Sequence, residues 1–521
     1  MTTSDLERAC SEKLLLAFAG LEAGDDLLDR LRTRPPAGFT LFRALNAASP
    51  AQVRALTAAL QAAAAGDLPL LIAADQEGGQ LIAIPGTTPF PGNMALGAAG
   101  SAGLARRTGE AIGLELAAMG VNVNYAPVCD VNNNPANPVI GIRSFGEEPI
   151  AVARLCAAMV EGLQSAGVAA AAKHFPGHGD TGSDSHLGLP VLPHSRRRLA
   201  AVELPPFAAA IDAGARLVMS AHVALPALDG GLALPATLSP AVLGGLLRGE
   251  LGFEGVVVSD ALNMGAIDQG AGLGDSAVAA VRAGVDLLLC VLDADQVYDA
   301  LLHAAVTGLL APEHLAISAG RVRSLRRWLA GRPQPDLDVV ACVEHRALAA
   351  EIAERSVTLV RDDAHLLPLR LDAGARVAVV VPRPTDLTPA DTSSYVTCRL
   401  ASALRRHHAA VDEFLVPHAP ADDEVAALAV RARDYDLVIA GTINASAEPR
   451  QAALVNALLA TGVPLVAVAL RLPYDLVAYP AAPTYLCTYS ILDPSMAALA
   501  RVLFGQIPFT GRLPVSILGL S

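Results

Sequence analysis

The chain has 521 residues, of which 53% are hydrophobic and 17% charged, so it can bury large cores and is too long for one ordinary domain. Its net charge of −13 argues against nucleic acid as a partner, because phosphate binding requires a basic face. No stretch approaches the roughly 18 uninterrupted apolar residues of a membrane span, and the N-terminus lacks the basic start of a signal peptide. We therefore expect a cytoplasmic protein with no membrane partner.

Seven cysteines are scattered through apolar or mixed segments and form no CxxC pair. Free, buried thiols in a reducing cytosol explain this pattern better than a disulfide scaffold or a structural zinc site. They are Cys10, Cys129, Cys156, Cys290, Cys342, Cys398 and Cys487.

The first 330 residues alternate β-rich runs with alanine-rich segments that have helical spacing of their apolar residues. The expected strands are 14–20, 38–42, 69–75, 121–127, 167–175, 215–222, 255–261 and 285–291. Eight such units predict a (β/α)8 TIM-type barrel over residues 1–330, with an open doubly wound sheet as the alternative. The first strand is the weakest of the eight, because residues 10–20 fit a helix equally well.

A second, smaller domain is expected after a linker at residues 331–345, which contains two prolines close together. Its expected strands are 356–360, 376–381, 435–441, 463–470 and 483–489. The helical segments between most of them predict an α/β/α sandwich with a mainly parallel sheet over residues 346–521. No GxGxxG or P-loop motif indicates a nucleotide there.

Polar residues stand at or just past the carboxyl ends of several barrel strands. They are Asp75, Asn124, Lys173, His174, His222 and Asp260. In a barrel these positions converge on one face, where active sites are built. We therefore predict an active site at that face.

The segment 173–186, KHFPGHGDTGSDSH, is the most informative in the chain. It holds three of the 12 histidines and Lys173, one of only two lysines in a chain that otherwise uses arginine. A guanidinium does not replace a compact ammonium at a shaped site, so this lysine indicates a specific role.

Sugar linkages are commonly hydrolysed by two carboxylates acting on one glycosidic bond. Asp260, at the end of an apolar strand, is one candidate, and an N-cap of the following helix is its alternative role. Asp184 and His186 are the second candidate group. In an extended loop they would point to the same side, so that the carboxylate orients the imidazole as acid and then base.

A metal site is the main rival, because the same segment offers several ligand types. The candidate ligands are His174, His178, Asp180, Asp184 and His186. The charge of Lys173 beside a cation and the lack of a known zinc spacing argue against it, so no metal or cofactor is expected.

Together these motifs resemble glycoside hydrolase family 3, in its β-N-acetylglucosaminidase branch. The matching segments are KHFPGHGDTGSDSH, DQEGG (75–79), IGIRSFGEEP (140–149), VVVSDALNMGAI (256–267), AERSVTLVRD (353–362) and LFGQIPFTGRLPVSI (503–517). The resemblance implies a retaining enzyme in which Asp260 is the nucleophile, His186 the acid/base and Asp184 its partner. It implies removal of terminal GlcNAc from muropeptide or chitooligosaccharide fragments, as in peptidoglycan recycling.

The resemblance also implies which residues hold the sugar. Asp75, Arg143, Lys173 and His174 match the family's sugar-binding positions, and their charged groups suit sugar hydroxyls. His222 is a further candidate, with a packed core histidine as its alternative role.

One motif departs from the branch, whose members usually continue DQEGG as RVxR. Here Gln80 and Ala83 stand at the arginine positions, which places the sugar preference in question and makes Arg43 or the loop 87–93 the candidate substitute. The alternatives are a broader β-glycosidase, a phosphorylase, since an imidazole does not repel phosphate, a metal-dependent hydrolase, or a non-catalytic sugar-binding protein.

Overall fold

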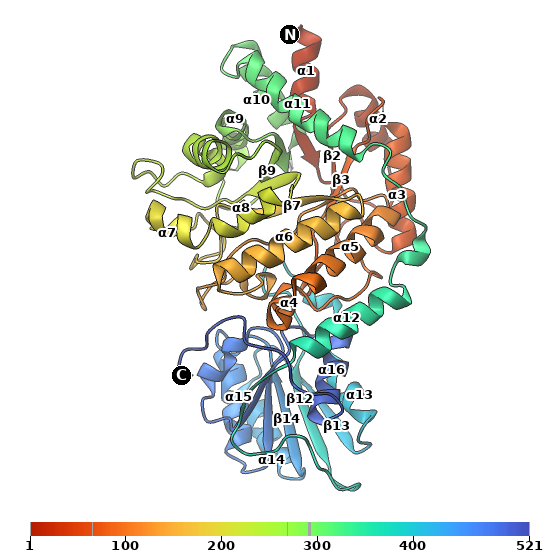
Figure 1. The fold of residues 1–521 in the computed structure, drawn as a ribbon, viewed down its shortest axis with the longest axis vertical. Helices are drawn as coiled ribbons and strands as arrows, with labels where there is room; N and C mark the ends of the chain where they lie inside the picture. The colour runs from red at the N-terminus through yellow and green to blue at the C-terminus, as the bar shows by residue number, and fades with distance from the viewer. Residues whose placement is uncertain (1, 65, 268, 290–292, 520–521) are drawn as a thin grey trace.

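The computed structural model describes residues 2–64, 66–267, 269–289 and 293–519. Figure 1 shows two bodies stacked along the long axis, with the N-terminus at the far end of the first and the C-terminus on the second. None of the described helices has the length and apolar character that a membrane crossing requires.

The first body is a closed barrel of parallel strands in the order β1-β10-β9-β8-β7-β6-β3-β2. Its strands are β1 (Leu14–Leu16), β2 (Gly38–Leu41), β3 (Leu71–Ala74), β6 (Val123–Asn124), β7 (Ala169–Phe175), β8 (Leu217–Ser220), β9 (Val256–Ala261) and β10 (Leu287–Leu289). The predicted barrel is confirmed and the open sheet is excluded. The end of the eighth predicted strand, residues 290–291, lies outside the described residues.

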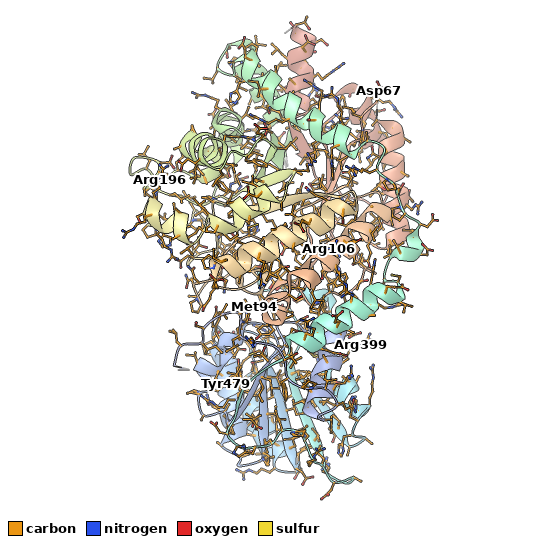
Figure 2. The ribbon with its side chains drawn as sticks, in the orientation of Figure 1. Asp67, Met94, Arg106, Arg196, Arg399 and Tyr479 are labelled. Atoms are coloured by element: carbon orange, nitrogen blue, oxygen red, sulfur yellow. The ribbon has the colours of Figure 1, made fainter. Side chains whose placement is uncertain are left out.

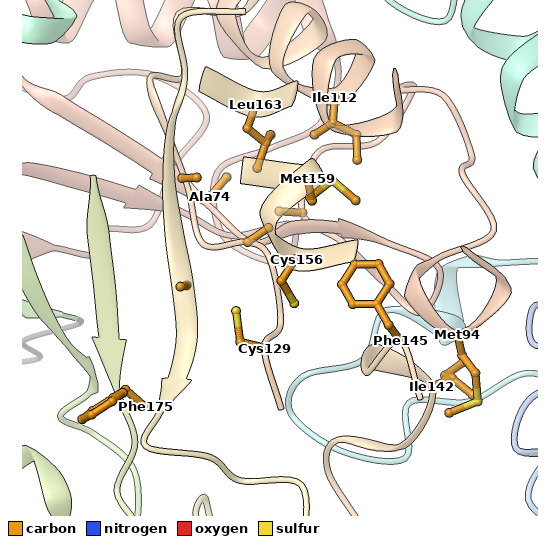
Figure 3. Close-up of a cluster of buried hydrophobic side chains, with 14 of the residues drawn as sticks. Ala74, Met94, Ile112, Cys129, Ile142, Phe145, Cys156, Met159, Leu163 and Phe175 are labelled. Atoms are coloured by element: carbon orange, nitrogen blue, oxygen red, sulfur yellow. The ribbon is translucent and has the colours of Figure 1, made fainter. Parts of the chain in front are cut away.

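The barrel strands are almost continuously apolar because both of their faces are buried. Alternate side chains fill the barrel interior, among them Leu15, Leu71 and Val258. Those on the opposite face pack against the surrounding helices, and Figure 3 shows such a cluster around Met159 and Leu163. The six described cysteines are free, and five of them are buried.

A ring of helices surrounds the barrel (Figure 1). Its helices are α1 (Thr3–Ser11), α2 (Asp25–Thr33), α3 (Pro50–Ala63), α4 (Asn93–Ala99), α5 (Ala102–Ala118), α6 (Pro149–Ser165), α7 (Arg196–Ala201), α8 (Pro205–Asp212), α9 (Leu273–Ala283), α10 (Ala294–Val306) and α11 (Pro312–Leu329). Local signals fix their starts: α6 begins with proline, and the Glu148 carboxylate accepts the free N–H groups of Ile150 and Ala151. The first predicted strand is confirmed, and the helix that competed for residues 10–20 ends at Ser11.

The second body is a six-stranded sheet in the order β11-β16-β15-β14-β12-β13. Its strands are β11 (Thr358–Asp362), β12 (Val377–Pro382), β13 (Val411–Val416), β14 (Leu437–Thr442), β15 (Leu465–Ala469) and β16 (Thr484–Cys487). Only β11 runs antiparallel, so the mainly parallel α/β prediction is confirmed. Strand β13 was missed because Asp412 and Glu413 interrupt its apolar pattern, which an edge strand tolerates.

Helices lie on both faces of this sheet (Figure 1). They are α12 (Val343–Ser356), α13 (Leu400–Arg405), α14 (Asp422–Ala432), α15 (Pro449–Leu459) and α16 (Asp493–Leu503). The exact residue bounds of the two domains stay a prediction.

Helix α12 and the chain after α16 are two of the segments that join the bodies. Helix α12 packs against α4 and α5 of the barrel as well as against α16, and Figure 2 shows Met94 of α4 beside the second body. The chain after α16 returns to the barrel, where Arg512 N–H donates to the Ala98 carbonyl at 3.0 Å and Glu147 N–H to the Pro514 carbonyl at 3.0 Å. A Cβ at Gly146 would lie 2.5 Å from the Pro514 carbonyl oxygen, so this contact requires glycine. The motif at 503–517 therefore tethers the two bodies.

Candidate active site

A cavity of about 360 Å³ opens at the carboxyl ends of the barrel strands. Six of the eight predicted site residues line it: Asp75, Arg143, Lys173, His174, His186 and Asp260. Asp184 reaches it through its bond to His186, whereas His222 does not line it. Topology explains the gathering, because parallel strands bring their carboxyl ends to one face.

Four charged groups form a buried network in one wall of the cavity. Both oxygens of the Glu77 carboxylate accept from Arg143, at 3.0 and 2.8 Å. The Lys173 ammonium lies 2.5 Å from Asp75 Oδ1 and 2.6 Å from Glu77 Oε1. Asp75 is the most exposed of the four, with 24% of its side chain accessible. The Asp75 carboxylate is thus fixed by Lys173 and remains accessible to a ligand in the cavity.

The pKa values of this network follow from burial and pairing. Burial would raise the pKa of Glu77, but attraction by Arg143 and Lys173 prevails and lowers it to about 2. Burial would lower the pKa of Lys173, but attraction by Asp75 and Glu77 prevails and raises it. Glu77 and Lys173 therefore stay charged at neutral pH. Glu77 was not predicted as a site residue, although it lies within the DQEGG motif.

Asp130 organises two of the histidines. Its Oδ2 lies 2.7 Å from His174 Nδ1, and its Oδ1 accepts the backbone N–H of His178 at 2.6 Å. The carboxylate is fully buried, and attraction by His174 lowers its pKa although burial opposes this. Sequence reasoning missed Asp130, although it directly follows the apolar run that contains β6.

The ring of His178 is buried and satisfied by two hydroxyls, with Thr181 Oγ1 at 2.6 Å from Nδ1 and Ser185 Oγ at 2.9 Å from Nε2. Burial lowers the pKa of His178 to about 4, so the ring is neutral at pH 7. It therefore serves as a brace between the start and the end of the catalytic loop, defined as residues 176–188.

The predicted Asp184–His186 pair forms as expected. Asp184 Oδ1 lies 2.6 Å from His186 Nδ1 and also accepts the His186 backbone N–H at 2.9 Å. These bonds lower the pKa of Asp184, although burial alone would raise it. The expectation of an extended loop is wrong, because Leu187 N–H bonds to the Asp184 carbonyl at 3.0 Å and closes a turn. The turn itself brings the two side chains together.

The catalytic loop is docked onto the segment that follows β9. Gly265 N–H donates to the His186 carbonyl at 3.0 Å, and Ala266 N–H donates to the Ser185 carbonyl at 3.2 Å. Since Asp260 belongs to β9, these bonds tie the position of the imidazole to that of the candidate nucleophile.

Asp260 faces the same cavity as His186. Burial would raise its pKa, but attraction by His174 and His186 and the hydrogen bond from the Ala261 N–H lower it, so the carboxylate is ionised. Its alternative role as a helix N-cap is wrong, because its Oδ1 accepts only the adjacent Ala261 N–H among the described residues and α9 starts at Leu273. An ionised carboxylate with an Asp–His pair in one cavity can perform nucleophilic and acid–base steps together.

His222 is fully buried at the rear of β9. Its Nε2 donates to the Ala261 carbonyl at 3.1 Å, and its Nδ1 accepts from Thr237 Oγ1 at 2.8 Å. Burial lowers its pKa, which agrees with a neutral ring. This geometry fits its alternative role as a packed histidine that supports the end of β9.

The candidate metal ligands divide between separate networks. His174 and His178 bond to Asp130, and His186 bonds to Asp184. The described residues bring three metal-capable groups close together at Asp180, His194 and Glu203, outside the cavity lining. There the Arg198 guanidinium lies 3.4 Å from Asp180 and 3.2 Å from Glu203. The cluster is therefore already charge-paired and anchors the catalytic loop to the chain that follows it.

The second domain supplies one wall of the cavity, which sequence reasoning did not predict. The C-terminal wall is the segment 386–395, from which Asp386, Thr388, Asp391, Thr392 and Tyr395 line the cavity. Its Thr388 hydroxyl is buried and bonds to none of the described residues. It is thus available to a ligand in the cavity.

The unusual Gln80 is the link to this wall. Its Nε2 donates to the Ala390 carbonyl at 3.0 Å, its Oε1 accepts from Arg471, and its carbonyl accepts the Thr392 N–H at 2.8 Å. Arg471 is also paired with Asp391 at 2.7 Å. An arginine at position 80 would place two guanidinium groups against each other, so glutamine and Arg471 fit as a pair.

Arg43 lies where the sequence suggested a substitute cation. It lines the cavity, its guanidinium carbon lies 4.4 Å from the centre of the Tyr395 ring, and its Nη1 is 3.4 Å from the Ile82 carbonyl. The pair Arg43–Tyr395 joins the barrel to the C-terminal wall at the cavity.

The carboxyl face of the barrel thus carries an ionised aspartate, an Asp–His pair and a network of buried charged groups, an arrangement that suits the cleavage of a glycosidic bond. Residues 32–325 match the family model described as Glycosyl hydrolase family 3 N terminal domain, and residues 357–519 match Glycosyl hydrolase family 3 C-terminal domain. The chain belongs to glycosyl hydrolase family 3 and is a glycoside hydrolase.

Known relatives agree with this assignment. The chain is 34% identical to Beta-hexosaminidase A of Pseudoalteromonas piscicida, over 94% of this chain and 91% of the relative. It is 42% identical to a Beta-hexosaminidase of Alkalilimnicola ehrlichii, over 52% of this chain and 78% of the relative. Among solved structures, a glycoside hydrolase family 3 beta-N-acetylglucosaminidase from Paenibacillus sp. str. FPU-7 has a TM-score of 0.93 at 41% identity, and the match covers 99% of both chains.

Proposed function

We propose that the enzyme is a retaining exo-β-N-acetylglucosaminidase that removes terminal, non-reducing GlcNAc. The observation that carries the proposal is the placement of Asp260 and the Asp184–His186 pair around one cavity. The relatives named as hexosaminidases and the Paenibacillus N-acetylglucosaminidase support this sugar.

In the first step the Asp260 carboxylate attacks the anomeric carbon and forms a glycosyl ester, while the bond to the leaving oxygen breaks. Protonated His186 gives its Nε2 proton to that oxygen. Asp184 holds Nδ1–H, which leaves Nε2 directed to the substrate. In the second step the neutral imidazole takes a proton from water, the water oxygen attacks the anomeric carbon, and Asp260 leaves as a carboxylate.

The sugar hydroxyls would be bound by the charged network. Asp75 accepts from hydroxyl groups, while Lys173 holds its carboxylate in place and Lys173 and Arg143 supply further donors. The C-terminal wall closes one side of the cavity, which favours a terminal sugar over the middle of a chain. Arg43 is proposed as the residue that compensates for the two arginines missing at positions 80 and 83.

Muropeptide or chitooligosaccharide fragments are proposed as natural substrates, with a cytoplasmic role in peptidoglycan recycling. A substrate panel tests this: aryl glycosides of GlcNAc, glucose and xylose, each with and without phosphate, followed by GlcNAc-terminated natural fragments. Preference for GlcNAc with no rate increase by phosphate supports the proposal. Equal use of glucose would indicate a broader β-glycosidase, and sugar phosphate as the product would indicate a phosphorylase.

The nucleophile is tested by Asp260→Ala and the isosteric Asp260→Asn on an aryl β-GlcNAc substrate. Both should lose about 10⁴-fold or more in kcat, since no covalent intermediate forms. Circular dichroism and thermal unfolding establish that the variants fold. Turnover at the wild-type rate by a folded variant would remove Asp260 from this role.

A further inference from the structure

A second cavity, of about 550 Å³, lies between the two domains. We call it the interdomain crevice. The loops that follow β12, β13, β14 and β15 form one side of it, and the barrel loop 135–138 forms the other. Its lining includes Pro138, Leu387, His418, Asn444, Leu472 and Tyr474. It contains neither Asp260 nor His186 and is therefore separate from the catalytic cavity.

The crevice lies where the strand order of the second sheet changes direction. Strand β12 lies between β13 and β14, and the chain leaves β12 first toward β13 and then returns to add β14 on the other side. The loops after β12 and β14 therefore diverge at the carboxyl ends of the strands. This arrangement is a topological switch point, where open α/β sheets generally bind their ligands. The volume also falls within the usual range for small-molecule sites.

Two donors in the crevice have no partner among the described residues. The Gln451 side-chain nitrogen donates to the carbonyls of His418 and Ile443 and lies 3.1 Å from His418 Nδ1. An amide nitrogen does not accept a hydrogen bond, so in the neutral ring the proton is on Nε2, which bonds to no described group. Burial lowers the pKa of His418, which agrees with a neutral ring. The amide oxygen of Asn444 accepts from Leu472 N–H at 3.4 Å, while its amide nitrogen donates to no described residue.

Apart from Glu448, the rest of the lining is apolar or uncharged. Pro138, Leu472 and the Tyr474 ring supply apolar surface, and Val477 remains 50% exposed. Such a combination, apolar surface beside a few directed donors, suits a ring with one apolar face and several oxygen atoms.

Charge narrows the ligand class further. Glu448 is the charged group in the described lining, and its carboxylate already accepts the backbone N–H of Arg450 as the N-cap of α15. No lysine or arginine belongs to that lining. Phosphates and carboxylates would therefore meet a negative group without a compensating cation, whereas a neutral ligand would not.

We propose that the interdomain crevice is a second binding site and that it takes a neutral saccharide, for which free GlcNAc is the test probe. The site goes beyond the proposed function, since it lacks the catalytic groups. It shares two walls with the catalytic cavity: Leu387 lies between Asp386 and Thr388, and Pro138 precedes Val139, and these neighbours line the catalytic cavity. Occupancy of the crevice should thus stabilise the C-terminal wall.

The test uses the full chain. Isothermal titration with GlcNAc measures the number of sites, and crystals soaked in the same sugar locate them. Two sugars per chain, one of them in the crevice beside His418 and Asn444, are expected, with no crevice binding of GlcNAc 6-phosphate. Sugar in the catalytic cavity alone would overturn the crevice proposal while leaving the proposed function intact. Sugar in the crevice alone would support the crevice proposal and count against the proposed function of the catalytic cavity.

Variants make the test specific. Ala447→Trp fills the crevice from an exposed position, and Ala427→Trp on α14 is the matched control outside it. The first should weaken crevice binding by about tenfold or more and the control should not, with hydrolysis of the aryl substrate retained in both. His418→Ala, which adds no bulk, should weaken the same site. Unchanged titration by both crevice variants would count against the proposal.

Discussion

The two domains present the same kind of surface, the carboxyl ends of parallel strands, to the interface between them, yet they differ in chemistry. At the barrel face the side chains are charged, buried and paired, as in the Lys173–Glu77–Arg143 group. At the second sheet the crevice holds apolar groups and uncharged donors. Topology thus supplies a cavity in both domains, whereas covalent chemistry is supported only where ionised groups are held together.

The difference also concerns what each face requires from its surroundings. Buried charges are costly to desolvate and persist only with partners, so the barrel site needs a second layer such as Asp130 and Glu77. The crevice needs no such layer, because its unpaired donors are uncharged and its carboxylate, Glu448, already caps α15. Changes at the barrel face should therefore have larger effects than changes at the second domain.

After the loss of Asp260, the largest effect is expected from the acid/base group. His186→Ala should reduce kcat by about 10²–10⁴-fold on substrates with a sugar leaving group, because the departing oxygen then lacks a proton donor. The loss should be much smaller on nitrophenyl glycosides, whose leaving group needs little assistance. Steady-state rates on the two substrate types provide the measurement, and equal losses on both would argue against a proton-donor role.

The buried cation comes next. Lys173→Ala should lower the free energy of unfolding by about 3–5 kcal/mol, since it leaves Asp75 and Glu77 without their shared partner. The control is Arg399→Ala, which removes an exposed pair with Asp493 on the second domain (Figure 2) and should cost under about 1 kcal/mol. Denaturant unfolding measures the free energy of unfolding of both variants. Equal losses would contradict the expectation that the charged groups of the barrel matter more to stability than those of the second domain.

A pH effect should follow from His178. Its folded pKa of about 4 lies below the ordinary value of 6.5, so the unfolded chain binds more protons between those values. Stability should therefore be unaffected above pH 6.5 and decline by about 3 kcal/mol as the pH falls toward 4. Below about pH 4.5, Glu77 adds a further loss of stability. Its pKa is about 2 in the folded protein and 4.5 in the unfolded chain, so the unfolded chain takes up the proton first as the pH falls.

His178→Gln should flatten the decline between pH 6.5 and 4, whereas His303→Gln, on the barrel surface, should not. Melting temperatures across this pH range provide the test. A wild-type slope retained in the His178 variant would show that other groups control acid sensitivity.

The smallest effect is expected at the link to the second domain. Arg471→Ala removes the partner of Asp391 and Gln80, so the C-terminal wall should become less ordered. We expect KM to rise by about tenfold with a smaller change in kcat, because binding and not proton transfer is affected. Arg383→Ala, an exposed arginine near the same segment, should leave both constants unchanged. A large fall in kcat at constant KM would assign Arg471 a catalytic role.

Much of the barrel and its site could be predicted from the sequence. Strand periodicity located all eight barrel strands, and the motifs located Asp260, His186 and the charged residues around them. Strand β13 was missed because charges on an exposed edge hide its pattern. Asp130 was missed because a lone aspartate after an apolar run has no distinguishing signal, and its contacts with His174 and His178 cross 44 and 48 residues.

The sequence by itself determined the two α/β folds and the residue types at the barrel's carboxyl ends, because periodicity and motifs are local properties of the chain. Only the tertiary structure decided that the segment 386–395 closes the catalytic cavity and that Gln80 meets Arg471, residues 391 positions apart. Contacts of this length depend on how two finished domains pack. No local pattern encodes that packing. The interdomain crevice depends on it as well, because both domains contribute residues to its lining.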